Sequence, residues 1–253
     1  MKVLHVLFAL AFALLSTLLT GCGSEDEPTP PAISVEEAAE VIATSLAADN
    51  GGLAREMAEA AQSAQALADG FVPGEVILKN DNCGVLTPLN LQISKPNGVI
   101  TFDYALSMSL LLGCVNNVPN SAGLDFTSTG AFDSPRIASN STATAELSLG
   151  GINPASGSLL AFNGSYSRSG SLTLKLRNLS TTNTLSASLD VDLNPNNYLF
   201  VGGSGQITLS GTTSTGGSYN YSAQLSILQN NLAQLTINGV LFQINLTTGA
   251  YSN

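Results

Sequence analysis

The side chains in this chain that could do chemistry are almost all carboxylates. The only histidine, His5, lies in an apolar segment close to the N-terminus, so the chain after that segment has no imidazole. Ser-His-Asp and Cys-His catalysis and histidine-containing zinc sites are therefore excluded, as is the side chain best suited to proton transfer near neutral pH. We expect no catalytic residue, no metal ligand and no cofactor, and hence a protein that is not an enzyme.

Carboxylate chemistry stays open as a minor alternative. Asp190 and Asp192 lie two positions apart on a predicted strand, so both side chains project from one face. A glycosidase needs two carboxylates roughly 5–10 Å apart across a cleft, usually with aromatic side chains nearby, and this chain has no tryptophan. We predict solvated, outward-facing acids, and keep a carboxylate-only hydrolase as an alternative. The acids that we consider for such a role in the predicted β region are Asp103, Asp125, Asp133, Glu146, Asp190 and Asp192.

Two further motifs have a simple structural explanation. Calcium could bind at Asn80-Asp81-Asn82 or at the Asp190/Asp192 pair, but neither stretch matches a known calcium loop, and Asn/Asp clusters are ordinary turn formers. Gly202-Gly203-Ser204-Gly205 lacks the Gly-Lys-Ser/Thr of a phosphate loop and leads into a strand. We predict a glycine-rich bend or bulge there.

The N-terminal segment has the features of a secretory signal. Lys2 precedes an apolar run from Val3 to Leu19, and small residues follow it. A basic start, a short apolar core and small residues before a cleavage point are typical of a signal peptide. The run of roughly 17 residues is at the lower limit for crossing a bilayer.

The segment ends in Leu19-Thr20-Gly21-Cys22, which resembles the lipobox of bacterial lipoproteins. The resemblance covers only the first two dozen residues. It implies that residues 1–21 are a signal peptide and that Cys22 is acylated, so that the protein is attached to a membrane of the cell envelope. The following Gly-Ser lacks the aspartate that retains enteric-type lipoproteins in the inner membrane, which implies the outer membrane.

The remaining two cysteines are predicted to form a structural disulfide. If Cys22 carries lipid, Cys83 and Cys114 are left as a pair in an oxidising compartment. Their spacing is not that of a Cys-x-x-Cys redox or metal site. Folding the first hairpin at Pro96-Asn97-Gly98 brings Cys83 opposite about residue 110, within a short bulge of Cys114.

Charge and composition divide the mature chain into three parts. We assign residues 22–33 to the lipidated cysteine and an acidic, proline-rich tether, residues 34–70 to a helical hairpin, and residues 71–253 to one β domain. Residues 23–70 hold ten acids against one base, and residues 71–253 hold eight acids against six bases. No basic face is available to bind phosphates, so nucleic-acid binding is not expected.

The predicted helical hairpin begins with a capping box. Ser34 and Glu37 have the spacing of this motif, and Asn50-Gly51-Gly52 separates two apolar stripes with helical periodicity. The stripes are mostly alanine, so the helices can lie close to another surface. We expect that surface to be the protein's own β domain, and the alternative is a docking surface for another protein.

From Glu75 onward the apolar residues alternate with a period of two. The clearest run is Ile100 to Leu112, and turn-forming clusters separate about ten to twelve such segments. We predict a mainly β fold, an antiparallel meander that forms a sandwich, a curved sheet or a barrel.

Several functions are compatible with these features. The first is non-catalytic binding or carriage of a hydrophobic small molecule on the apolar face of long strands. The second is a structural or protein-interaction role in the cell envelope. An outer-membrane barrel is a less favoured alternative, because tryptophan girdles are absent and the chain ends in Tyr251-Ser252-Asn253.

Overall fold

The computed structural model describes residues 32–72, 75–76, 83–152 and 158–253. Ala32 to Asn253 form one compact unit. The predicted signal peptide, its cleavage residues Leu19, Thr20, Gly21 and Cys22, and the Asn80-Asp81-Asn82 stretch lie outside the described residues. Among the helices of the described residues, none is both long enough and apolar enough to span a membrane.

Two α-helices begin the unit, as predicted. They are α2 (Val35–Leu46) and α3 (Leu53–Ala68), and the short 3-10 helix η1 (Ala48–Asn50) lies between them. The capping box is present, because the Ser34 side chain accepts a hydrogen bond from the Glu37 N–H and the Glu37 carboxylate accepts one from the Ser34 N–H. Gly51, with a φ of 67°, ends η1 at the predicted break.

The rest of the described chain forms an antiparallel meander, which confirms the predicted fold class. Eleven strands pair in the order of the sequence, from β3 at one edge to β13 at the other, and the sheet is open. A separate two-stranded sheet joins β1 (Phe71–Val72) and β2 (Glu75–Val76). The eleven strands are β3 (Leu86–Lys95), β4 (Thr101–Val115), β5 (Val118–Asp133), β6 (Ile137–Gly150), β7 (Leu160–Leu174), β8 (Leu179–Leu193), β9 (Phe200–Thr213), β10 (Ser218–Ile227), β11 (Leu232–Ile237), β12 (Val240–Asn245) and β13 (Tyr251–Ser252).

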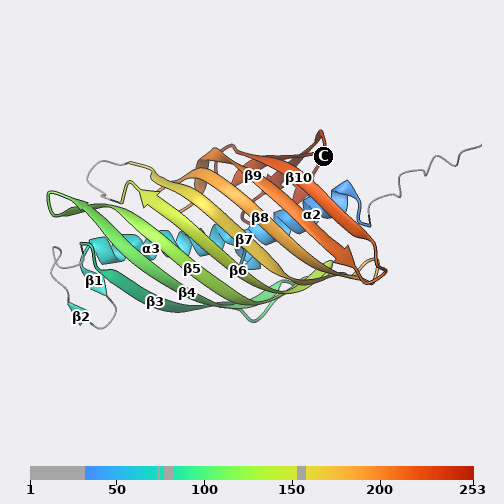
Figure 1. Ribbon diagram of the computed structural model, residues 1–253, viewed down its shortest axis with the longest axis horizontal. Coiled ribbons are helices and arrows are strands. Elements are labelled where there is room, and N and C mark those ends of the chain that lie inside the picture. The colour runs from blue at the N-terminus through green and yellow to red at the C-terminus, as the bar shows by residue number, and fades with distance from the viewer. Residues whose placement is uncertain (1–31, 73–74, 77–82, 153–157) are drawn as a thin grey trace, which may run out of the picture. The chain divides into compact units, whose positions relative to one another are not determined.

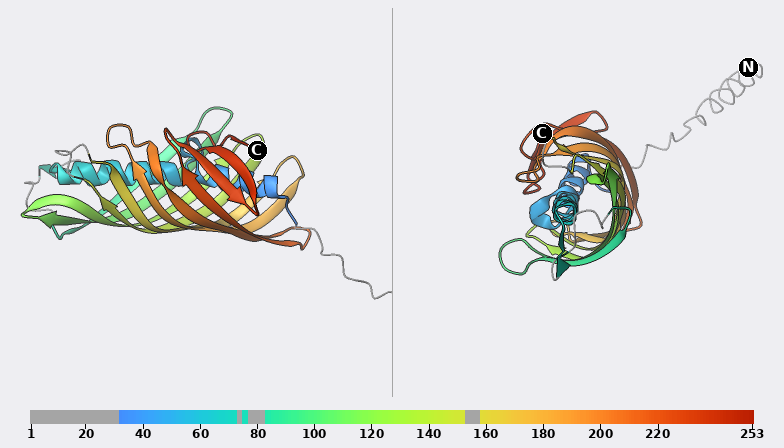
Figure 2. Two further views of the ribbon diagram at one scale, coloured as in Figure 1. Left: turned by 90° about the horizontal axis from the view of Figure 1, so that it is seen from above. Right: turned by 90° about the vertical axis from the view of Figure 1, so that its left-hand side faces the viewer.

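The large sheet is strongly curved, and its concave side forms a trough (Figures 1 and 2). Apolar side chains face the trough and polar ones face outward, as the alternation along β4 predicts: Phe102 and Tyr104 are buried, whereas Asp103 is exposed. Ser, Thr and Asn dominate the convex face. Of the three predicted forms, the structure therefore has the curved sheet.

A row of glycines allows the sheet to curve this tightly. Gly130, Gly170 and Gly211 lie on alternate strands of one register line. A Cβ on Gly130 or Gly170 would lie 2.0 Å from a carbonyl oxygen of the neighbouring strand, and one on Gly211 would lie 2.5 Å from such an oxygen. Backbones approach this closely only where side chains are absent. The full line, from β4 to β10, is Tyr104, Gly130, Ser141, Gly170, Asn183, Gly211 and Tyr219.

The two helices fill the trough, one after the other along its length (Figure 2). The predicted hairpin, with the helices folded back on one another, is thus replaced by an end-to-end arrangement. The connection explains why: the N–H groups of Ala48 and Asp49 donate to the carbonyls of Leu246 and Thr247, so the break is fixed to the β12–β13 loop. The alanine stripes pack on the chain's own sheet, as expected, and are fully buried at Ala38, Ala39, Ala43, Ala60, Ala61 and Ala64.

Cys83 and Cys114 form a disulfide, with their Cα atoms 5.8 Å apart. The predicted pair is therefore confirmed, although the predicted register was about four residues off. Lys95 pairs with Phe102, and residues 96–100, between β3 and β4, form a longer connection than the predicted turn. Continuing that pairing past Leu86 and Leu111 brings Cys83 to the level of Cys114, next to a bulge at Gly113/Cys114.

Candidate functional site

One ion pair is buried at the centre of the trough. Glu56, on α3, is fully buried, and Arg168, on β7, is 7% exposed. Arg168 Nη2 lies 2.9 Å from Glu56 Oε1. Burying a charge is costly unless it is paired and hydrogen-bonded. We therefore take this ion pair and its hydrogen-bond partners in the described core as the candidate functional site.

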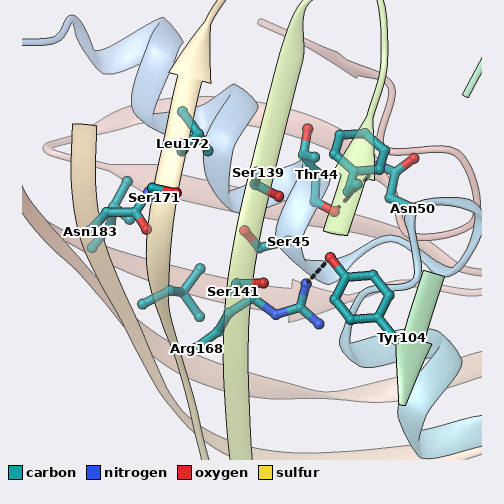
Figure 3. A pocket seen from close by; sticks show the side chains of 13 residues that line it. Thr44, Ser45, Asn50, Tyr104, Ser139, Ser141, Arg168, Ser171, Leu172 and Asn183 are labelled. Atoms are coloured by element: carbon teal, nitrogen blue, oxygen red, sulfur yellow. Dashed lines mark hydrogen bonds between the residues drawn. The ribbon is translucent and has the colours of Figure 1, made fainter. Parts of the chain in front are cut away.

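Arg168 uses its donors on both the sheet and the helical region. Its Nε donates to the Tyr166 hydroxyl at 2.7 Å, one terminal nitrogen donates to the Tyr104 hydroxyl at 3.3 Å, and the other reaches the Gly51 carbonyl at 3.2 Å. The guanidinium carbon also lies 5.1 Å from the centre of the Tyr104 ring. Figure 3 shows Arg168 and Tyr104 facing one another in this pocket.

Glu56 is only partly satisfied. Its Oε1 accepts hydrogen bonds from Arg168 and from the Ser128 hydroxyl, while Oε2 is buried without a partner among the described residues. We call Arg168, Glu56, Ser128, Tyr104 and Tyr166 the arginine cluster. Of its five members only Glu56 comes from a helix, because the others lie on β7, β5, β4 and β7.

The neighbours of Arg168 in the arginine cluster favour its charged form. Burial raises the pKa of Tyr166 well above its ordinary value near 10, and the Arg168 charge opposes that shift in part. Burial by itself lowers the pKa of Arg168, but Tyr166, Glu56 and Tyr104 together raise it above its ordinary value. The guanidinium is thus a permanent cation beside the hydroxyls of Tyr166 and Tyr104. Chemically, this is a site for holding an anion.

A narrow cavity and an outer cleft adjoin the cluster. The cavity has about 20 Å³ of room for the centres of water molecules, enough for about one ordered water. It is lined by Arg168, Ser141 and Asn50 among others, and Asn50 Oδ1 and Ser141 Oγ are buried without a partner among the described residues. A surface cleft of about 650 Å³ shares Thr44, Asn50 and Phe132 with the cavity, so the two are adjacent.

Two further ion pairs join the helices to the sheet side of the molecule. Arg136 forms a bidentate pair with Glu40, and Arg177 Nη1 lies 2.7 Å from Glu37. With Arg168, these are all the arginines in residues 71–253, and each one pairs with a glutamate of α2 or α3. The acidic bias of the N-terminal part of the chain therefore has a structural counterpart, since its acids face arginines presented by the β region.

Of the acids named in the sequence analysis, Asp125 and Glu146 are register partners on the neighbouring strands β5 and β6, where both are exposed. Asp190 is exposed and Asp192 half-buried, and both project from the convex face of β8, as predicted. Gly202, Gly203 and Gly205 lie within β9, next to a register shift at Asp192/Leu193, as expected for a glycine-rich irregularity. No group of three or more His, Cys, Asp or Glu side chains gathers anywhere in the described ranges.

Sequence reasoning missed the arginine cluster, although its signals are present. Arg168 points inward from β7, on the same face of the strand as Tyr166 and Leu172. Glu56 lies on the apolar stripe of α3, beside Met57 and Ala60. A charged residue at a position where the pattern expects an apolar one, once in a strand and once in a helix, indicates a buried ion pair.

No protein-family model, curated protein or solved structure matches this chain.

Proposed function

We propose that this protein is a lipid-anchored protein of the outer membrane, held by Cys22, that binds or carries a hydrophobic molecule without catalysis. The ligand would lie on the concave apolar face, in place of the helices. The observation that carries this proposal is that one N-terminal helical segment, residues 35–68, covers the apolar face of an open eleven-stranded sheet.

The helical segment is suited to leave and return. Much of its buried surface is alanine, so each residue covers little apolar area. Its polar attachments, the three arginine–glutamate pairs and hydrogen bonds such as Tyr198 to Gln65 at 2.8 Å, are reversible. They add to the apolar contacts that the segment makes in the core through Ile42, Leu46, Leu53 and Met57. The surface cleft lined by Asn50 and Phe132 lies next to the inner cavity, which these two residues also line.

A disulfide that pins the start of the segment tests this proposal. α3 is tethered to β3 through residues 69–85, so fixing the other end restrains the segment at both ends. A Cβ on Gly217 would lie 2.7 Å from the Ala32 Cβ, and the mean separation in disulfides is about 3.8 Å, so a shift of about 1 Å in the β9–β10 turn suffices. We therefore choose the double variant A32C/G217C, with A32C and G217C alone as matched controls.

The readout is binding of N-phenyl-1-naphthylamine, a probe whose fluorescence rises in apolar surroundings. The protein is the chain from residue 23 onward, exported to a periplasm, since every described element lies in the unit that begins at Ala32. We expect the single variants to bind the probe like the wild type and the oxidised double variant to bind it at least tenfold more weakly. Equal binding by the linked and unlinked proteins would contradict a ligand under the helices.

Native mass spectrometry of the same wild-type protein, before and after solvent extraction, gives the second readout. A discrete added mass that disappears on extraction supports carriage of a hydrophobic molecule. A clean mass without ligand, together with no probe binding, would instead favour the second candidate below.

The second candidate is an interaction role in the envelope, and an exposed apolar patch favours it. Val85, Leu86, Leu111, Val115 and Val118 are each at least 44% exposed. Leu86 is paired with Leu111, and Val115 with Val118, so the patch lies at the disulfide end of β3, β4 and β5. Contiguous exposed apolar residues often mark a protein contact.

A further inference from the structure

Arg168 is the only buried lysine or arginine of the described residues. On β7 it lies eight residues from Leu160, which is roughly 26 Å along the strand. Over that length the trough is lined almost entirely by apolar side chains. Successive register lines of buried residues beyond Arg168 include Met108, Phe126 and Tyr166, then Leu110, Leu124 and Leu147, then Leu112, Leu149 and Phe162.

α3 has the same order of groups as this surface, with one charged residue followed by an apolar face. α3 has 16 residues, about 24 Å, and the 12 residues after Glu56 span about 18 Å, so its apolar part covers about two thirds of the apolar strip. Glu56 lies in its first turn, against Arg168, and the buried face that follows is apolar as far as Ala68, with Gln65 near the far end on Tyr198. In shape and polarity α3 presents a carboxylate followed by an apolar tail.

From this correspondence we infer that the ligand of the trough is an amphiphile with an anionic head and an acyl chain, and that Arg168 binds the head. Glu56 and the apolar face of α3 occupy these two positions while the ligand is absent. This inference rests on the function proposed above, and it adds the chemical class of the ligand and the residue that selects it.

The reason for selection is the charge that α3 leaves behind. When the helix moves away, Arg168 loses the Glu56 carboxylate and the Gly51 carbonyl and keeps the Tyr104 and Tyr166 hydroxyls, which belong to the sheet. A desolvated cation without an anion is strongly unfavourable. A carboxylate or phosphate ester head restores the pair, and Ser128 and the two tyrosines can donate further hydrogen bonds to it. A neutral or cationic head restores nothing.

Three probes with the same chain and different heads test this inference: dodecanoate, dodecan-1-ol and dodecyltrimethylammonium. Each displaces N-phenyl-1-naphthylamine from the chain that begins at residue 23, below the concentration at which the probe aggregates. We expect dodecanoate to displace the dye at a concentration at least tenfold lower than either of the other two. We also expect Glu56→Gln to strengthen dodecanoate binding severalfold, because the competing carboxylate is gone.

The decisive variant removes the charged pair without leaving either charge alone. R168Q could unfold the protein by stranding Glu56, so we use R168M/E56L, in which apolar side chains of similar size replace the pair. A cooperative melting transition serves as its folding control. The double variant should bind dodecanoate and dodecan-1-ol within about twofold of each other.

Each outcome bears on a different claim. A dodecanoate preference that persists in R168M/E56L would show that Arg168 is not the head-group site. Equal binding of all three probes by the wild type, with binding lost in oxidised A32C/G217C, would overturn the head-group inference and leave the proposed function intact. Failure of the wild type to bind any of the probes would overturn both.

Discussion

At the scale of single residues, the arginine cluster is a device for specificity more than for stability. A buried pair such as Arg168 and Glu56 gains little over apolar side chains of the same volume, but losing one partner is costly. Because Arg168 also contacts Gly51, only one placement of the helix break satisfies its donors. The cluster thereby fixes where α3 lies along the trough.

The buried tyrosines predict how stability depends on pH. The pKa values of Tyr166, Tyr198, Tyr219, Tyr221 and Tyr251 are all raised, mainly by burial. In the unfolded chain these groups lose their protons near about pH 10, whereas the folded protein retains them to higher pH. The free energy of unfolding should therefore be unaffected by these tyrosines below that pH, and should fall as the pH rises above about 10.

Urea unfolding at a series of alkaline pH values checks this, with tyrosinate absorbance recorded on the same samples. The folded protein should ionise its tyrosines at higher pH than the same chain in concentrated urea. Coincident titration curves for the folded and unfolded protein would contradict the prediction.

At the scale of elements, the curvature of the sheet depends on where its side chains are missing. Gly170, in β7, lies too close to the backbone of β6 for a Cβ, which would be 2.0 Å from the Asn140 oxygen. The same line passes Gly51, where a Cβ would lie 2.6 Å from the Tyr104 ring. The glycine row thus accommodates both the bend of the sheet and the break between the helices.

Gly170→Ala should therefore destabilise the protein by at least about 1–3 kcal/mol, the usual cost of overpacking, because the colliding atom is backbone and cannot rotate away. Gly123→Ala is the matched control. It lies in β5, and the nearest atom to its added Cβ would be 3.9 Å away. Thermal unfolding of both variants checks this: Gly170→Ala should melt several degrees lower, and the control should melt close to the wild type. Equal losses in both would show that the row is not tightly packed.

At the scale of the whole molecule, the N-terminal part of the chain would link the proposed membrane anchor to the proposed ligand site. The described unit begins at Ala32, and Ile33 is held there by a hydrogen bond from the Tyr221 hydroxyl to its carbonyl. The chain that leads from a lipidated Cys22 would therefore enter directly into the helical segment that covers the trough. Membrane attachment and access to the trough would then share one stretch of chain.

Replacing the proposed acceptor cysteine tests the anchor. Cys22→Ala should abolish globomycin-sensitive processing and release the protein from membranes, since no acyl chain can be attached. Incorporation of labelled palmitate and fractionation of membranes measure the two effects. The wild type and Cys83→Ala serve as controls, and both should keep their label. Retention of Cys22→Ala on membranes would mean that the anchor is wrong or incomplete.

The features that could be predicted correctly from the amino-acid sequence were local or periodic. The alternation from Ile100 to Leu112 placed β4 and its buried face, and Ser34 with Glu37 placed the start of α2. The pairing of Cys83 and Cys114 followed from counting cysteines. Each of these depends on neighbours in the chain or on the type of residue, which the sequence states directly.

The features that became visible only in the folded molecule depend on the pairing register across many strands. Gly130, Gly170 and Gly211 are about 40 residues apart in sequence, and they form one row only because each hairpin has a particular length. Likewise, Arg168 meets Glu56 across 112 positions. Small errors in turn length, such as that in the first hairpin, shift such a row by several residues. The tight curve, the helices in the trough and the buried cation therefore emerge only when all the strands are in place.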